Sequence, residues 1–99
     1  MLNIEIKKNN GELLIAVEGR LDTKTAPELE ATVNDNIEGV EKLIFDFNKL
    51  IYISSAGLRV LLSSHKRMLK QGDMVIKNVP EEVVDTFEIT GFADILTIE

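Results

Sequence analysis

Two stretches of alternating hydrophobic and polar residues near the amino terminus predict a β-hairpin. Strict alternation over several residues is typical of strands that bury one face. The stretches are separated by Asn9-Asn10-Gly11, and an Asn-Gly pair suits a tight turn between antiparallel strands. The alternating hydrophobic positions are Leu2, Ile4 and Ile6 in the first stretch and Leu13, Ile15 and Val17 in the second.

Hydrophobic residues at helical spacing predict a first helix over residues 26–38. Leu29, Val33 and Ile37 recur every four residues, which places them on one face of a helix. A proline close to the start favours a helix beginning there, and Gly39 is a suitable residue for its end.

Two further helices follow later in the chain. The second begins after Ser54-Ser55 and extends to about Gln71, before Gly72. The third begins at Pro80 and has hydrophobic residues at helical spacing. The expected apolar side of the second helix consists of Leu58, Leu61, Leu62, His65, Met68 and Leu69, with Arg59, Ser63, Lys66 and Lys70 opposite, and the third helix carries Val83, Val84 and Phe87.

Short hydrophobic runs between the helices predict further strands. Residues 43–47 are apolar on both faces, as expected for a central strand that is buried on both sides of a sheet. Residues 74–76 predict another strand, and residues 95–98 suit either a last strand or a short helix. The alternation of strands and helices predicts one α/β domain over residues 1–99, with a mixed, mostly parallel central sheet flanked by helices and an amino-terminal β-hairpin.

Composition and charge narrow the possible functions. Seventeen acidic and eleven basic residues give a formal net charge of -6, which argues against nucleic acid or an anionic membrane surface as the main partner. The absence of cysteine and the single histidine exclude disulfides, thiol catalysis and the usual zinc ligand sets. No signal peptide or long apolar run is evident, so we expect a cytoplasmic protein without direct membrane insertion.

The serine pair before the second helix is the first candidate for function. Ser54 or Ser55 suits the N-cap of that helix, where its hydroxyl would accept a hydrogen bond from a free backbone amide. A helix amino terminus also favours added negative charge, so a phosphate on one of these serines would be tolerated. Spacing alone leaves both interpretations open, a plain cap and a modification site.

Other residues offer weaker candidates. Asp22 and Asp46 would suit a magnesium-binding phosphoacceptor site, but the adjacent acidic pair usual for such a site is missing. His65 falls within a helical stripe, where a core-edge histidine is expected rather than a phosphocarrier. The glycines are spread singly, so no loop is rich enough to wrap a nucleotide. We therefore expect no bound metal, no cofactor and no catalytic residues.

Two surface features remain open. The basic residues of the second helix form either a solvated face or a contact with an acidic partner. Among Ile51, Tyr52, Ile53 and Phe92 we expect one or two to be exposed beside the serine pair and the others to lie in the core.

Residues 46–62, together with residues 18–22, resemble the STAS domain of bacterial anti-sigma factor antagonists. Residues 87–92 resemble the carboxyl-terminal helix and turn of the same family, so the similarity covers nearly the whole chain. The resemblance implies a phosphorylation-controlled binding module without enzymatic activity. Family members bind an anti-sigma factor that is itself a serine kinase, which frees a sigma factor, and the kinase then inactivates them by phosphorylating one serine.

The resemblance also implies which residues act. The phosphorylated serine of the family lies two residues before the glycine of the helix, which corresponds to Ser55 here, with Ser54 as the less favoured acceptor. Many members carry aspartate in place of Ser54, and serine or threonine in place of Ala56. A serine phosphatase would act on the phosphorylated form. The partner-binding residues implied are Asp22, Thr23, Ser54, Ser55, Ala56, Gly57 and Arg59.

A second function of a different class fits the same resemblance. The chain would then be a structural STAS subunit of a larger assembly, such as a lipid-transport complex or a stressosome-like scaffold, with no phosphorylated form. An enzyme is the third possibility, but the sequence offers only scattered carboxylates and cap serines, with no base at an evident spacing.

Overall fold

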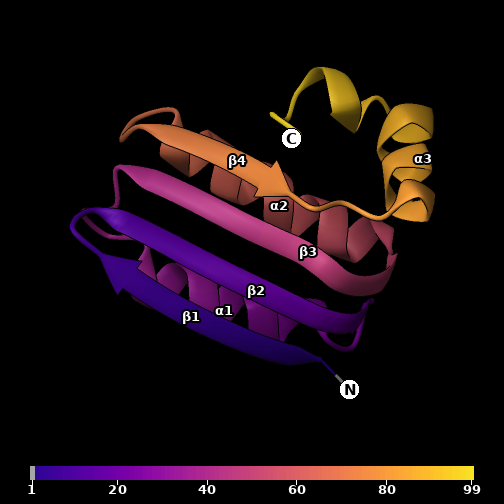
Figure 1. Ribbon diagram of the computed structural model, residues 1–99, viewed down its shortest axis with the longest axis horizontal. Helices are drawn as coiled ribbons and strands as arrows, with labels where there is room; N and C mark the ends of the chain where they lie inside the picture. The colour runs from indigo at the N-terminus through magenta and orange to yellow at the C-terminus, as the bar shows by residue number, and fades with distance from the viewer. Residues whose placement is uncertain (1) are drawn as a thin grey trace.

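The computed structural model describes residues 2–99 and confirms the predicted order of elements (Figure 1). Alternating hydrophobic residues form the hairpin strands, and residues at four-residue spacing form the helices. None of the helices in this part of the chain is long and apolar enough to cross a membrane. The elements are β1 (Asn3–Asn9), β2 (Glu12–Leu21), α1 (Ala26–Asn36), β3 (Lys42–Ile53), α2 (Ser55–Met68), β4 (Asp73–Lys77), α3 (Glu81–Thr90) and a short 3₁₀ helix, Phe92–Asp94.

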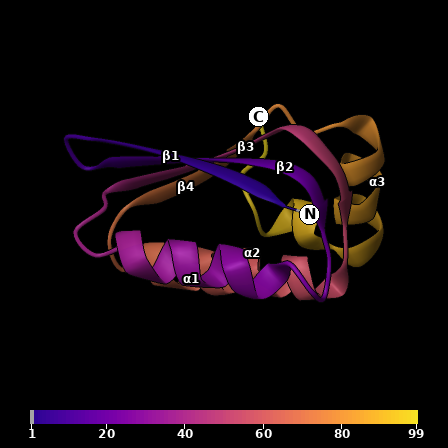
Figure 2. The same cartoon turned by 90° about the horizontal axis from the view of Figure 1, so that it is seen from below.

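The four strands form one mixed sheet in the order β1-β2-β3-β4, which is also their order along the chain (Figure 1). β1 and β2 are antiparallel, whereas β2–β3 and β3–β4 are parallel. Both parallel connections step the same way across the sheet, so right-handed crossovers place their helices on the same face. Figure 2 shows this arrangement, with α1 and α2 side by side below the sheet and α3 beyond the end where β3 finishes.

The hydrophobic core lies between the sheet and the pair α1 and α2. Paired positions across the strands share a face, so Ile15, Phe45 and Ile76 form one buried row across β2, β3 and β4. The rings of Phe45 and Phe47 pack with centroids 5.8 Å apart. Ile44 is also buried, on the opposite face of the sheet, which confirms the prediction that this strand is covered on both sides.

The second helix differs from its prediction at its carboxyl end. α2 stops at Met68 instead of about Gln71, and Leu69 is 69% exposed, so placing this leucine in the apolar stripe was wrong. Ser64, by contrast, is buried, and its hydroxyl donates to the carbonyl oxygen of Val60 at 2.8 Å. A serine in a helix can donate its hydroxyl to a carbonyl oxygen on the preceding turn. Ser64 can therefore be buried without a hydrogen-bond partner from another element.

Three other element boundaries also differ from those predicted from the sequence. α1 ends at Asn36, two residues before its predicted end. β3 continues to Ile53, so the hydrophobic residues after Leu50 extend the central strand instead of forming a separate run. The tail holds the 3₁₀ helix and then a single parallel bridge between Ile98 and Ile76. Residues 95–98 are therefore neither a full strand nor a helix.

Gly72 joins α2 to β4 at a point where two backbone segments almost touch. The amide of Asp73 donates to the carbonyl oxygen of Glu41 at 2.9 Å. A Cβ atom added to Gly72 would lie only 1.9 Å from that same oxygen. Close approach, and not a left-handed backbone, explains the glycine at this position.

Candidate functional site

The ends of β2 and β3 bring the two candidate segments together. Leu21 and Ile53 are paired in the parallel register, so the residues that follow them emerge next to each other. The amide of Ser54 donates to the carbonyl oxygen of Leu21 at 2.8 Å. This bond fixes the loop that starts at Asp22 beside the turn that starts α2.

The two serines occupy different environments. Ser54 is the N-cap residue, with extended backbone, and its carbonyl oxygen accepts the amide of Leu58 at 3.0 Å. Its hydroxyl makes no capping bond and is buried without a partner among the described residues. Ser55 is the first helical residue and is exposed. The predicted cap position is therefore confirmed, whereas the predicted capping bond of the hydroxyl is wrong.

Replacing Ser54 with alanine is expected to leave the free energy of unfolding unchanged or to raise it by up to about 1 kcal/mol. A buried hydroxyl without a hydrogen bond is unfavourable. Its removal therefore breaks no hydrogen bond and relieves the cost of burying an unpaired polar group. Thr25, the N-cap residue of α1, is the matched control, because its hydroxyl accepts the amide of Asp22 at 2.8 Å. Thr25→Ala should lose about 1 kcal/mol in urea unfolding; an equal loss in Ser54→Ala would contradict the buried, unpaired hydroxyl.

The Asp22 carboxylate closes the loop after β2. Its Oδ1 atom accepts the backbone amides of Lys24 at 3.0 Å and Thr25 at 3.1 Å, and its own amide donates to the Thr25 hydroxyl. Because the backbone amide of Thr25 above all stabilises the ionised form, the pKa of Asp22 lies below its usual value. No hydrogen bond joins Asp22 to either serine in the described chain. The carboxylate is thus held ionised beside the serine turn by its own loop.

The lowered pKa of Asp22 predicts how stability depends on pH. Since the ionised carboxylate is favoured in the folded state, its contribution is present above the pKa of the unfolded chain and is lost as pH falls through the lower folded pKa. Asp22→Asn cannot titrate. The difference in Tm between the wild type and Asp22→Asn at pH 7 should therefore shrink between about pH 4 and pH 2. A difference that stays constant over this range would show that the charge of Asp22 does not matter for folding.

Gly57 allows α2 to approach β2 closely. A Cβ atom at this position would lie 2.7 Å from Cγ of Leu21 and 2.9 Å from Cγ1 of Ile53, both of which are buried. The glycine therefore sets the distance between the start of α2 and the ends of β2 and β3. Ala56 is half-buried against the core beside it.

The remaining predicted site residues lie at the surface around this turn. Thr23 and Arg59 are exposed, Thr23 in the Asp22 loop and Arg59 on α2. Ile51 is 62% exposed and Tyr52 is 41% exposed, whereas Ile53 is buried. Phe92 is half-buried against the core, so the prediction of one or two exposed apolar residues is confirmed.

The sequence interpretation did not identify Arg20. Its guanidinium carbon lies 4.3 Å from the centre of the Tyr52 ring, a cation–π contact that orients both side chains. Arg20 and Tyr52 are paired positions of β2 and β3. Only the register of the parallel strands reveals this contact, and the register requires knowledge of the fold.

The other candidates do not form a site. Asp46 pairs with Ala16 in the sheet, and its Oδ1 atom accepts the amide of Asn48 at 3.0 Å and the side-chain amide of Asn78 at 3.2 Å. Within residues 2–99 no group of three or more His, Asp or Glu side chains is placed to hold a metal ion. His65 is half-buried on α2, away from the helix amino terminus.

Comparison with known proteins relates this arrangement to a family. The sequence profile of the STAS domain matches residues 3–99. BtrV of Bordetella bronchiseptica, provisionally named an anti-sigma factor antagonist, is 32% identical over 99 residues, which cover 98% of this chain and 85% of the relative. The anti-sigma-B factor antagonist of Bacillus subtilis is 29% identical over 98 residues, which cover 98% of this chain and 90% of the relative.

Solved structures share the fold. An anti-sigma factor antagonist from Mycobacterium paratuberculosis superposes with a TM-score of 0.89 at 18% identity, covering 99% of this chain and 85% of that one. SpoIIAA of Bacillus in its phosphorylated form gives a TM-score of 0.76 at 17% identity, covering 98% and 91%. The sequence profile and the relatives show that this chain belongs to the STAS domain family, among the anti-sigma factor antagonists.

Proposed function

We propose that the protein is an anti-sigma factor antagonist that binds an anti-sigma factor serine kinase through the Asp22 loop and the Ser55 turn. The names of its relatives support the antagonist role. In this proposal, binding sequesters the kinase and releases a sigma factor, and the kinase ends the complex by phosphorylating Ser55. The observation that carries the proposal is the exposed serine at the first position of α2, fixed beside the Asp22 loop.

The two serine hydroxyls differ in accessibility, and this favours Ser55 as the acceptor. A kinase must bring the γ-phosphate of ATP in line with the hydroxyl oxygen. The hydroxyl of Ser54 is buried, so its phosphorylation would require the turn to open. Ser55 is exposed and needs no such change.

A phosphate on Ser55 would change the charge of the surface and leave the fold intact. It would add about two negative charges at a helix amino terminus, where the first turn of α2 holds no acidic residue. The protein therefore stays folded. The ionised Asp22 lies on the neighbouring loop, so the phosphate adds a like charge, and a partner that covers both must remove these charges from water.

The remaining parts of the proposal follow from this role. The protein is a substrate of its partner and not an enzyme, it needs no cofactor, and it acts in the cytoplasm where sigma factors bind RNA polymerase. A serine phosphatase that acts on the phosphorylated form would restore binding.

Phosphorylation by the anti-sigma factor from the same organism tests the proposal. The purified chain is incubated with that protein and Mg-ATP, and intact-mass and fragment mass spectrometry locate any phosphate. We expect one phosphate, on Ser55, in wild type and in Ser54→Ala, and none in Ser55→Ala. A stable complex with no phosphate in any condition would favour the structural subunit of a larger assembly instead.

A further inference from the structure

The basic residues of the chain are concentrated along one helix. The segment from Ser55 to Lys70 holds Arg59, Lys66, Arg67 and Lys70 and no acidic residue. The remaining seven basic residues share the rest of the chain with all seventeen acidic residues. A protein with a net charge of -6 therefore carries one strongly positive helix.

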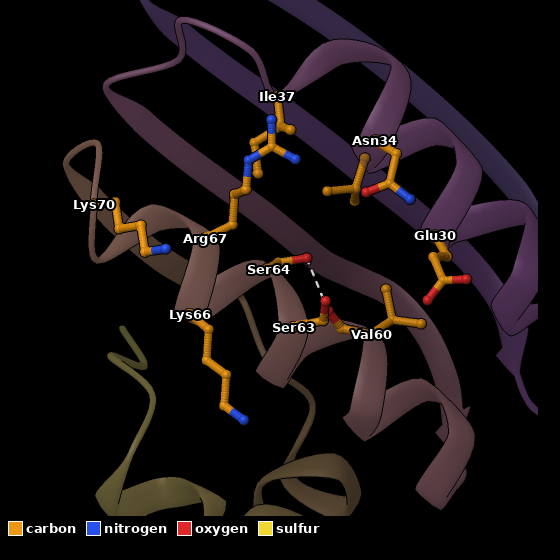
Figure 3. A pocket seen from close by; sticks show the side chains of 10 residues that line it. Glu30, Asn34, Ile37, Val60, Ser63, Ser64, Lys66, Arg67 and Lys70 are labelled. Atoms are coloured by element: carbon orange, nitrogen blue, oxygen red, sulfur yellow. Dashed lines mark hydrogen bonds between the residues drawn. The ribbon is translucent and has the colours of Figure 1, made fainter.

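Three of these basic residues, Lys66, Arg67 and Lys70, border a groove between α1 and α2 on the face of the helices that points away from the sheet. The groove has a volume of about 420 Å³ and lies over the buried residues Val33, Ile37 and Val60. Figure 3 shows the side chain of Arg67 extending from α2 toward Ile37, the residue that follows α1, with Glu30 at the other end of the groove. The groove thus combines an apolar floor with one basic wall.

No acidic side chain of the described chain neutralises this wall. The single ion pair within residues 2–99 joins Lys77 and Glu99, which lie elsewhere. The Nε atom of Arg67 donates to Oε1 of Gln71 at 3.3 Å. The side-chain amide of Gln71 in turn donates to the carbonyl oxygens of Ile37 at 3.0 Å and Val40 at 2.8 Å. Arg67 is therefore held over the end of α1 while its charge stays unpaired.

The helix dipole does not explain the positions of all these basic residues. Lys66 and Arg67 lie in the last turn of α2, where positive charge is favourable in any helix. Arg59 lies just after the first turn, too far from the carboxyl end for the dipole to favour a positive charge there. A requirement outside the helix itself accounts better for basic residues near both of its ends.

The basic surface is continuous with the Ser55 turn. The exposed residues Ser55, Arg59, Ser63 and Lys66 follow one another at intervals of three or four, so they lie along one side of α2. A partner that covers Ser55 can therefore extend along the helix to the groove without crossing another element.

We propose that the groove between α1 and α2 binds an acidic segment of the same protein partner that the Ser55 turn contacts. This inference rests on the proposed function and adds the chemistry of the partner surface. The concave shape and the apolar floor fit a protein segment that carries both carboxylates and an apolar side chain. A flat anionic membrane fits less well, because the net charge of the whole protein repels it.

Charge reversal in the groove tests this proposal. The double variant Lys66→Glu/Arg67→Glu is compared with wild type for binding to the anti-sigma factor by surface plasmon resonance at several salt concentrations. The matched control is Lys7→Glu/Lys8→Glu, an exposed basic pair on β1 that receives the same change of charge. We expect the groove variant to bind about 10- to 100-fold more weakly, with slower association and a smaller dependence on salt, and the control to bind within about twofold of wild type.

The possible outcomes separate the two proposals. If wild type does not bind the anti-sigma factor, the proposed function is wrong. If wild type binds and the two double variants bind equally well, the groove proposal alone is wrong. Sedimentation of wild type, but not of the groove variant, with phosphatidylglycerol vesicles would overturn it in favour of a membrane. Should the reversal impair folding by circular dichroism, Lys66→Gln/Arg67→Gln should still weaken binding about threefold to tenfold.

Discussion

Replacing Ser55 with aspartate is expected to weaken binding of the anti-sigma factor about a thousandfold, which corresponds to a loss of about 4 kcal/mol. The reason is that the side chain lies at the centre of the proposed contact, where a new carboxylate must lose its water without gaining a partner. The ionised Asp22 on the neighbouring loop adds a like charge to the same surface. Isothermal titration calorimetry with the purified anti-sigma factor measures the effect directly.

Two variants serve as controls for this experiment. Ser55→Ala removes the hydroxyl without adding charge, and it should bind like wild type and remain bound in the presence of Mg-ATP. Asn9→Asp adds the same single charge on an exposed residue of β1, at the opposite end of the sheet from Ser55. Equal weakening by Ser55→Asp and Asn9→Asp would point to overall charge and would contradict a local contact at Ser55.

The stability of Ser55→Asp should separate loss of binding from loss of folding. An acidic residue in the first turn interacts favourably with the amino terminus of a helix, so the free energy of unfolding should stay the same or rise by about 0.5 kcal/mol. A variant that neither binds nor folds would give no support to a switch at this position.

Gly72→Ala is expected to destabilise the protein by about 4 kcal/mol, a large part of the stability of an ordinary small domain. The added Cβ atom would lie 1.9 Å from the carbonyl oxygen of Glu41, and no rotamer change relieves this contact because the backbone fixes the position of Cβ and the oxygen is itself a backbone atom. Moving the backbones apart would break the bond from the amide of Asp73 to Glu41 and disturb the pairing of β4 with β3. Urea unfolding followed by circular dichroism measures the loss.

Gly39→Ala is the control for this prediction. Gly39 has a left-handed backbone, with φ of +79°, but a Cβ atom there would meet nothing within 4 Å. Its replacement should cost about 1–2 kcal/mol through backbone strain alone. If Gly72→Ala were no worse than Gly39→Ala, the close approach of the two backbones would not be the reason for the glycine.

The fold could be predicted well from the sequence because its signals are local. The alternation in the hairpin and the four-residue spacing of Leu29 and Val33 each act within one element. The mixed sheet followed from the order of these elements and the handedness of their connections. The boundaries that failed, at Leu69 and after Leu50, depend on which neighbours cover the chain, and a local pattern does not contain this information.

The candidate site could be predicted in position but not in detail. The Ser54-Ser55 pair before an apolar helix located the turn, and the resemblance associated Asp22 with it. The burial of the Ser54 hydroxyl depends on packing against distant residues, and the Asp22 carboxylate binds its own loop instead of a serine. The contact of Arg20 with Tyr52 depends on strand register. The contact of Arg20 with Tyr52 joins residues far apart in the sequence, whereas the bonds of Asp22 are local and depend on the backbone conformation of its loop.

The agreement between strand order and chain order has a consequence for synthesis of the protein. Each new strand leaves the ribosome with its pairing partner already made, so the sheet can grow one strand at a time from the hairpin β1–β2. No strand must wait for a later segment to be inserted between it and its neighbour, so each parallel pairing needs only the single helix and the loops that connect its two strands. At every stage, however, the newest strand presents an open edge, and an open edge can pair with another nascent chain. The bridge from Ile98 to Ile76 forms after the last strand, so the tail covers part of the open edge of β4.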